Sequence, residues 1–232
     1  MHPQRSFAFA PSTQARFDNF ESGANGELLT RLQQLEVGRF SGLWLYGPAG
    51  RGKSHLLQAA AQHAWQRASA DIAADVAYLP LARVSDPVAL EGLEARALVL
   101  LDDLDHWLGS EAHERALMAL YTGLFERAAT LIVASAAGPG TLVTALPDLA
   151  SRLRAMARFE VLPIDEDARQ RVLEARAALR GVALRESALS YWLRRGPRDL
   201  KRLLEDLELL LDDALGEHSP VTVNTVKRVL DL

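Results

Sequence analysis

The sequence contains no cysteine among its 232 residues. Disulfide bonds and thiolate metal sites are therefore excluded, and the composition suits a reducing compartment. No apolar run approaches the roughly 18 residues that a membrane-spanning helix requires. The N-terminal stretch also lacks the apolar core of a signal peptide. We therefore expect a cytoplasmic protein without a membrane partner.

An excess of basic residues is missing as well. The formal net charge is −4, so the surface as a whole is not expected to bind nucleic acid without specificity, although a local basic patch stays open. The six histidines show no spacing typical of a metal site, and we assign them surface or packing roles. The chain is long enough for one large domain or two smaller ones.

What the sequence does contain is a phosphate-binding loop pattern, G-x-x-x-x-G-K-[ST], at residues 47–54. Its glycines let the backbone turn tightly and bring N–H groups against phosphate oxygens. Lys53 adds a positive charge, and the Ser54 hydroxyl is suited to ligate Mg²⁺. The flanking residues read as a buried strand before the loop and a helix after it. The residues predicted to bind nucleotide here are Gly47, Pro48, Ala49, Gly50, Arg51, Gly52, Lys53, Ser54 and His55.

Two carboxylates end a continuous apolar run at residues 97–101. Such a run is typical of a parallel strand buried on both faces, and α/β folds bind ligands where these strands end. We predict that Asp102 holds Mg²⁺ through water and that Asp103 polarises the attacking water. The alternative is a strand that ends in an acidic turn. Asp105, just beyond, is interpreted as part of a helix start or of the surface.

Strand and helix patterns alternate as far as residue 164, and this alternation predicts an α/β domain of three layers with a mainly parallel, five-stranded sheet. In the strand at 75–81, Pro80 indicates an edge strand or a strand end. The expected strands are 42–46, 75–81, 97–101, 130–135 and 158–164.

From Asp165 onward only helical spacing remains, and glycine and proline interrupt it. The expected helices are roughly 166–180, 186–195, 197–215 and 222–231. We therefore predict a flexible N-terminal arm at 1–16, a nucleotide-binding α/β domain at 17–164 and a small all-helical lid domain at 165–232.

The order of these features resembles the AAA+ ATPases, and among them the clade of the bacterial initiator DnaA. The likeness covers about residues 17–232. It implies ADP or ATP with Mg²⁺ as ligands, with Phe17, Asn19 and Arg198 among the nucleotide-binding residues. The stretches that carry it are Phe17-Asp18-Asn19-Phe20 with Gly23 and Asn25, Gly52-Lys53-Ser54-His55-Leu56-Leu57, Leu149-Ala150-Ser151-Arg152-Leu153 and Gly196-Pro197-Arg198-Asp199-Leu200.

Within this clade, a core and lid without an initiator's N-terminal interaction domain or C-terminal helix-turn-helix domain resemble the Hda family, regulators that inactivate the initiator. The resemblance implies DnaA and the DNA polymerase sliding clamp as partners. It also implies that DNA is contacted only through the clamp, and it leaves open whether the protein forms a homo-oligomer. It further implies that Arg152 promotes ATP hydrolysis in the partner, with Arg154 as the rival for that role.

The same resemblance gives the N-terminal arm a function. Gln4, Phe7 and Phe9 fit the outline of a clamp-binding peptide, whereas Arg5 stands where the family usually has an aliphatic residue. From the pattern alone, two aromatics on a polar segment are also compatible with an arm that folds onto its own domain.

One departure from the clade concerns catalysis. After the strand at 130–135 the clade usually has an acidic or amide residue, whereas this chain has Ser135-Ala136-Ala137. Ala136 offers no group that orients water, and Ser135 could do so only if its hydroxyl pointed inward. We therefore expect slow intrinsic ATP turnover and a stable ADP-bound state.

Three functions other than a regulator that promotes ATP hydrolysis in a partner stay open. They are a nucleotide-binding adaptor without catalysis in a partner, a DNA-binding loader and a small-molecule kinase.

Overall fold

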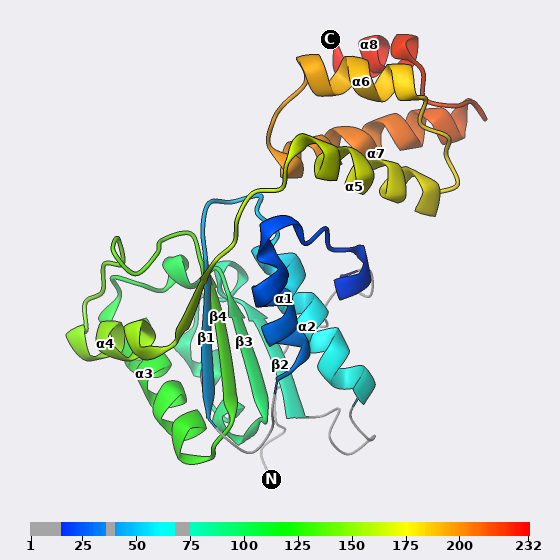
Figure 1. The fold of residues 1–232 in the computed structure, drawn as a ribbon. Helices are drawn as coiled ribbons and strands as arrows, with labels where there is room; N and C mark the ends of the chain where they lie inside the picture. The colour runs from blue at the N-terminus through cyan, green and yellow to red at the C-terminus, as the bar shows by residue number, and fades with distance from the viewer. Residues whose placement is uncertain (1–14, 36–39, 68–74) are drawn as a thin grey trace. The chain divides into compact units, whose positions relative to one another are not determined.

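The structure is a computed structural model that describes residues 15–35, 40–67 and 75–232. The predicted clamp-binding residues Gln4, Phe7 and Phe9 lie outside the described residues. The chain divides into two compact units, here called the α/β unit and the helical unit (Figure 1). The helical unit comprises residues 21–24 and 163–232, and the other described residues form the α/β unit.

A five-stranded sheet in the order β2-β3-β4-β1-β5 forms the centre of the α/β unit. All its pairings are parallel, which confirms the predicted sheet. β2 is an edge strand, as Pro80 indicates. The apolar runs β3 and β4 lie inside the sheet and are buried throughout. The strands are β1 (Ser41–Tyr46), β2 (Val76–Pro80), β3 (Leu98–Asp102), β4 (Thr130–Ser135) and β5 (Ala157–Glu160).

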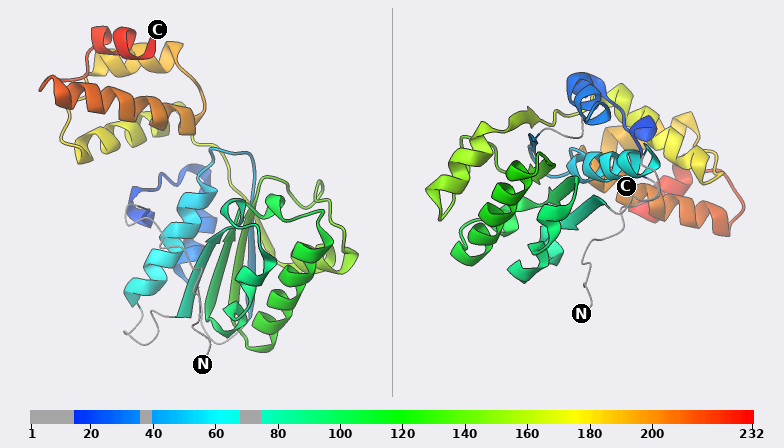
Figure 2. Two further views of the ribbon diagram at one scale, coloured as in Figure 1. Left: turned by 180° about the vertical axis from the view of Figure 1, so that it is seen from behind. Right: turned by 90° about the horizontal axis from the view of Figure 1, so that it is seen from below.

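Helices cover both faces of the sheet, so the α/β unit has three layers (Figures 1 and 2). α1 (Gly26–Gln33) and α2 (Lys53–Arg67) pack on one face, where Leu43 and Leu45 of β1 belong to the core. α3 (Glu111–Glu126) and α4 (Pro147–Ala155) pack on the other face, against the intervening Trp44. Successive residues of a strand point to opposite faces, so β1 contributes to both cores.

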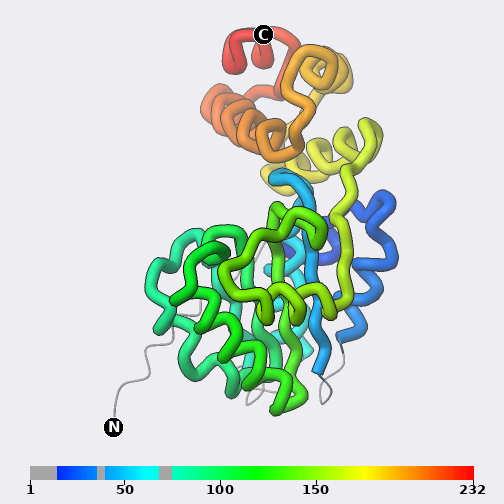
Figure 3. The backbone as a smooth tube through the Cα atoms, turned by 90° about the vertical axis from the view of Figure 1, so that its left-hand side faces the viewer, coloured from blue at the N-terminus to red at the C-terminus, as the bar shows by residue number. Residues whose placement is uncertain are grey.

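The helical unit consists of α5 (Glu166–Leu179), α6 (Glu186–Arg195), α7 (Leu200–Gly216) and α8 (Val223–Leu230). Figure 3 traces these helices from yellow to red. Their amphipathic faces enclose a separate core that includes Trp192, Leu203 and Leu207, each 0% exposed. None of the helices that the structure describes is long and apolar enough to span a bilayer.

Side-chain caps explain where several of these helices start. The carboxylate of Asp165 accepts a hydrogen bond from the Ala168 N–H at 2.7 Å, at the start of α5. Asp199 caps α7 in the same way. These caps satisfy N–H groups that have no partner within the helix, so the local sequence sets the helix boundaries.

Candidate functional site

The phosphate-binding loop occupies the turn between β1 and α2. Gly47, Gly50 and Gly52 have φ angles of +137°, +78° and +88°, which L side chains rarely adopt. At Gly52 a Cβ atom would lie 2.8 Å from the ring of Phe20. Backbone conformation and space therefore both require glycine here, and the loop keeps the open backbone surface that a phosphate needs.

Lys53, the first residue of α2, is buried and turned back across this loop. Its Nζ donates hydrogen bonds to the carbonyl oxygens of Gly47 at 2.6 Å and Pro48 at 2.9 Å. Burial lowers the pKa of Lys53, and the charges of Asp102, Asp105 and Asp103 oppose that shift. The ammonium group therefore lies within the field of three carboxylates, close to where nucleotide phosphates would bind.

Asp102 ends β3 and is 2% exposed. Its Oδ1 accepts a hydrogen bond from the Asp103 N–H at 3.0 Å, and its Oδ2 accepts one from the Tyr78 hydroxyl at 3.0 Å. Burial raises the pKa of Asp102, and a hydrogen bond with the Ser54 side chain opposes the rise. The structure thus brings together Ser54 and Asp102, the two residues that the sequence predicts as magnesium ligands.

This pair fits a magnesium ion bound with a nucleotide. Hydroxyl and carboxylate oxygens are the ligands that Mg²⁺ prefers, and it commonly takes only one or two from the protein. A charged carboxylate buried at a strand end, beside an open glycine loop, is otherwise an unfavourable arrangement. Asp103, the predicted water-polarising residue, is half-buried and has a φ of +55°, a conformation that Asp tolerates better than most residues.

The end of β4 has no acidic or amide side chain, and Ser135 supplies the polar group there. Ser135 is 0% exposed; its hydroxyl accepts a hydrogen bond from Trp44 Nε1 at 2.6 Å and donates one to the Ala137 carbonyl at 2.6 Å. Because a hydroxyl has one proton, this donor is already used inside the chain. Ser135 therefore does not replace the missing acidic or amide group in this arrangement.

Asp105 lies in a short 3₁₀ helix, Leu104–His106, as the sequence interpretation expected, and has an additional role that the sequence did not reveal. Its carboxylate accepts hydrogen bonds from the backbone N–H groups of Ala136 and Ala137, the second at 2.9 Å. It therefore connects the segment after β3 to the segment after β4, at the carboxyl ends of these strands, where Asp102 also lies.

The N-terminal motif packs on helix α2. Phe17 is 8% exposed and meets His63 edge-on, with 5.5 Å between the ring centres. Phe20 lies beside Gly52, and its ring centre is 5.7 Å from that of His55. Phe20, which we did not predict as a site residue, is therefore the aromatic that contacts the phosphate-binding loop.

The backbone around Phe17 and Phe20 is held by polar contacts to its neighbours. The Oδ1 atom of Asn19 accepts a hydrogen bond from the Arg16 N–H at 3.1 Å. The Arg16 carbonyl oxygen lies 2.9 Å from Nε2 of His55. The predicted site residue Asn19 thus makes a hydrogen bond within the N-terminal motif, and His55 links the motif to α2.

The two candidate arginines lie on α4, on the sheet face opposite α2. The guanidinium carbon of Arg152 is 5.3 Å from the centre of the Tyr121 ring. Arg154 is exposed, and its Nε donates a 3.4 Å hydrogen bond to the Pro139 carbonyl. Because the sheet separates α4 from α2, the structure does not bring Arg152 together with this chain's own phosphate-binding loop.

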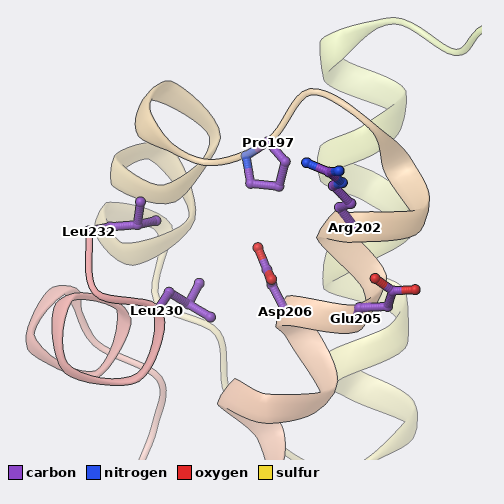
Figure 4. A pocket seen from close by; sticks show the side chains of 6 residues that line it. All are labelled: Pro197, Arg202, Glu205, Asp206, Leu230 and Leu232. Atoms are coloured by element: carbon purple, nitrogen blue, oxygen red, sulfur yellow. The ribbon is translucent and has the colours of Figure 1, made fainter.

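Arg198, a predicted nucleotide-binding residue, belongs to the helical unit and is exposed just before α7. Its carbonyl accepts a hydrogen bond from the Arg169 guanidinium at 2.7 Å. The helical unit also has a pocket of about 350 Å³ (Figure 4). Two carboxylates line this pocket against one guanidinium, so it lacks the positive charge that phosphates require. Its lining residues are Pro197, Arg202, Glu205, Asp206, Leu230 and Leu232.

Comparison with known proteins places these observations in a family context. Residues 165–230 match the family model described as Hda, lid domain. The crystal structure of domain III of the Thermotoga maritima replication initiation protein DnaA superposes with a TM-score of 0.81 at 19% identity, over 96% of this chain and 98% of that one.

Longer proteins of similar fold extend beyond the matched region. AMPPCP-bound DnaA from Aquifex aeolicus gives a TM-score of 0.69 at 20% identity, over 86% of this chain and 66% of that one. The RuvB Holliday junction branch migration motor of Thermotoga maritima gives 0.61 at 16% identity, over 87% and 64%. The chain therefore has the fold of DnaA domain III and of RuvB, and its residues 165–230 match the Hda lid-domain model.

Proposed function

We propose that this protein is a regulator of chromosome replication of the Hda type. It binds ADP or ATP with Mg²⁺ and, on the DNA-loaded sliding clamp, stimulates hydrolysis of the ATP held by DnaA. The observation that carries the proposal is the match of residues 165–230 to the Hda lid model, joined to an α/β unit of DnaA fold.

Nucleotide binding is supported by the arrangement around the phosphate-binding loop. Backbone N–H groups of the loop and the Lys53 ammonium would hold the phosphates, while Ser54 and Asp102 would hold Mg²⁺. The metal ion, when bound, neutralises phosphate charge. A DnaA of the same fold is bound to the nucleotide analogue AMPPCP.

Slow turnover of this chain's own nucleotide is supported by the end of β4. The Ser135 hydroxyl donates its hydrogen bond to the Ala137 carbonyl, and the next two residues are alanines without a polar side chain. Water beside the phosphates would then be oriented by Asp103 alone among the predicted residues. This shortage of water-positioning groups should slow hydrolysis of the bound ATP.

Stimulation of a partner is supported by the position of Arg152. Its helix lies across the sheet from α2, and the guanidinium stacks on an aromatic ring rather than pairing with a carboxylate among the described ion pairs. An arginine supplied from outside can stabilise the charge of phosphoryl transfer by about 10³–10⁵ in rate. Arg154, the rival for this role, lies on the same helix and contacts only a carbonyl in the described hydrogen bonds, so its separate replacement distinguishes the two arginines.

Single-turnover hydrolysis of ATP bound to the cognate initiator tests the proposal. The protein is added with and without DNA-loaded clamp, as wild type, Arg152→Ala and Arg154→Ala. We expect acceleration that needs the clamp, is lost in Arg152→Ala and survives in Arg154→Ala. An adaptor without catalysis in the partner would work equally well without Arg152, and absence of any acceleration would remove the proposed activity.

A further inference from the structure

The Tyr78 hydroxyl connects the predicted magnesium carboxylate to helix α2. Tyr78 lies on β2 and is 5% exposed, and its hydroxyl donates to Asp102 Oδ2 at 3.0 Å. Gln58 of α2 donates from Nε2 to the same hydroxyl at 3.1 Å. Three elements that are separate in the sequence are thus joined by one chain of hydrogen bonds.

The direction of this chain follows from its chemistry. A carboxylate only accepts hydrogen bonds, so the Tyr78 proton goes to Asp102, and the tyrosine oxygen accepts from Gln58. Burial and the charge of Asp102 raise the pKa of Tyr78, which keeps the hydroxyl protonated. The donor order is therefore Gln58, Tyr78, Asp102.

Packing alone does not explain a tyrosine at this position. The ring belongs to the core between α2 and the sheet, together with Leu98 and Leu100 of the neighbouring strand. A phenylalanine would fill the same space, whereas a buried hydroxyl must find hydrogen-bond partners to avoid a desolvation cost. Both partners of Tyr78 are polar side chains, and one of them, Asp102, is a predicted magnesium ligand.

The carboxylate of Asp102 has about four acceptor sites. Tyr78, the Asp103 N–H and the Ser54 side chain use three of them. Ser54 and Gln58 are four residues apart on α2 and therefore lie on one face of the helix, toward the strand ends. Helix α2 thus contacts Asp102 directly through Ser54 and indirectly through Gln58 and Tyr78.

We propose that Tyr78 is a positioning residue that orients the Asp102 carboxylate for the magnesium ion of a bound nucleotide. Its hydroxyl holds Oδ2, and about one acceptor site of the carboxylate remains beyond the three that the described hydrogen bonds use. The inference rests on the proposed nucleotide binding and adds a residue that the phosphate-loop pattern does not contain.

Equilibrium binding of a fluorescent ADP analogue at increasing Mg²⁺ concentration tests this role without any measurement of hydrolysis. Tyr78→Phe keeps the ring and removes the hydroxyl. We expect its affinity in EDTA to stay within about twofold of wild type, whereas the Mg²⁺ concentration for half-maximal enhancement rises about tenfold, since a hydrogen bond to a charged group is removed. An unchanged or lower Mg²⁺ requirement overturns the proposal.

A matched control and a second variant complete the design. Tyr191→Phe removes a tyrosine hydroxyl that donates to the Leu232 carbonyl in the helical unit, and its Mg²⁺ requirement should equal that of wild type. If Tyr78→Phe is unfolded by circular dichroism, Gln58→Leu decides the question. It should raise the Mg²⁺ requirement severalfold, and no change there also overturns the proposal.

The two levels of inference fail in different ways. A wild-type protein that binds no nucleotide contradicts the proposed function. A wild-type protein with Mg²⁺-dependent binding that Tyr78→Phe reproduces contradicts only the role of Tyr78.

Discussion

The guanidinium of Arg152 rests on the ring of Tyr121, with 5.3 Å between its central carbon and the ring centre. Tyr121 is 6% exposed and packs edge-on against Phe40, 5.2 Å between ring centres. The arginine is thus supported by a ring that is itself held in the core of the α/β unit. A cation–π contact leaves the guanidinium N–H groups available for other partners, unlike an ion pair with a carboxylate.

This relationship predicts different outcomes for two replacements of Tyr121. Tyr121→Phe keeps the aromatic face and should retain the stimulation of initiator-bound ATP hydrolysis within about twofold. Tyr121→Leu removes the face, and the loss of about 0.5–1 kcal/mol should lower the single-turnover rate at saturating protein about two- to fivefold. Equal effects of the two variants would show that the ring does not position Arg152.

The buried carboxylate of Glu114 lies on α3, the helix that also carries Tyr121. Glu114 is 0% exposed, and its carboxylate accepts hydrogen bonds from the N–H groups of Gly109 at 2.6 Å, Ala145 at 2.9 Å and Leu146 at 2.7 Å. Leu146 is the N-cap residue of α4, so Glu114 fixes the start of the helix that bears Arg152.

Glu114→Gln should destabilise the protein by about 2–3 kcal/mol, because one acceptor oxygen is replaced by an amide donor that faces backbone donors. The unfolding midpoint should fall by roughly 4–12 °C in thermal melts. Glu126→Gln, at the exposed end of α3, is the control and should stay within about 0.5 kcal/mol. Equal midpoints for the two variants would show that the Glu114 carboxylate does not stabilise the start of α4.

Gly52→Ala tests the requirement for glycine in the phosphate-binding loop. The φ of +88° and a Cβ contact of 2.8 Å with the Phe20 ring should force the loop out of its shape. We expect at least a tenfold loss of affinity for a fluorescent ADP analogue. Gly140→Ala meets no atom within 4 Å and should bind like wild type. Full affinity in Gly52→Ala would mean that the loop does not hold the phosphates as described.

Asp102→Asn should separate stability from function. Burial raises the pKa of Asp102 above its ordinary 3.8, so the folded state binds the proton more tightly than the unfolded state. The wild type therefore loses stability as pH rises through the folded pKa, since the buried carboxylate must then be charged. At neutral pH without nucleotide we expect the variant to be more stable by about 0.5–2 kcal/mol. The hydroxyls of Tyr78 and Ser54 can turn to accept from the new amide, unlike the backbone donors around Glu114.

Urea titrations of wild type and Asp102→Asn at several pH values check this sign. The advantage of the variant should shrink as pH falls and disappear below 3.8, where the wild-type carboxyl is neutral in both states. The variant should also lose the Mg²⁺ dependence of nucleotide binding. A variant that is less stable at neutral pH would indicate that the charged carboxylate is stabilised by its neighbours.

Leu207→Ala tests the separate core of the helical unit. Leu207 is 0% exposed, and its truncation should cost about 2–5 kcal/mol through lost burial and a cavity. Hydrogen exchange of amides in α5–α8 of the full chain should accelerate, while amides of the sheet keep their protection. Leu209→Ala removes a side chain that is 56% exposed on the same helix and should leave exchange nearly unchanged. Uniform acceleration across both units would contradict separate cores.

Local patterns in the sequence are enough to predict the strands, the helices of the second unit and the phosphate-binding loop. The buried parallel strands follow from uninterrupted apolar runs, the edge position of β2 from Pro80, and the helices of the second unit from apolar spacing after Asp165. The phosphate-binding loop could be read from spacing because its function resides in consecutive backbone groups. These features depend on residues within a few positions of one another, so one sequence suffices to recognise them.

The contacts that define the site depend instead on which strands become neighbours. Tyr78 meets Asp102 because β2 pairs with β3, and the Ser135 hydroxyl accepts a hydrogen bond from Trp44 because β1 pairs with β4. No periodicity announces either pairing, since each joins segments far apart in the chain. Packing on α2 likewise decides which aromatic lies beside the loop. Phe17 is buried against His63, whereas Phe20 lies next to Gly52, and their sequence positions alone do not distinguish them.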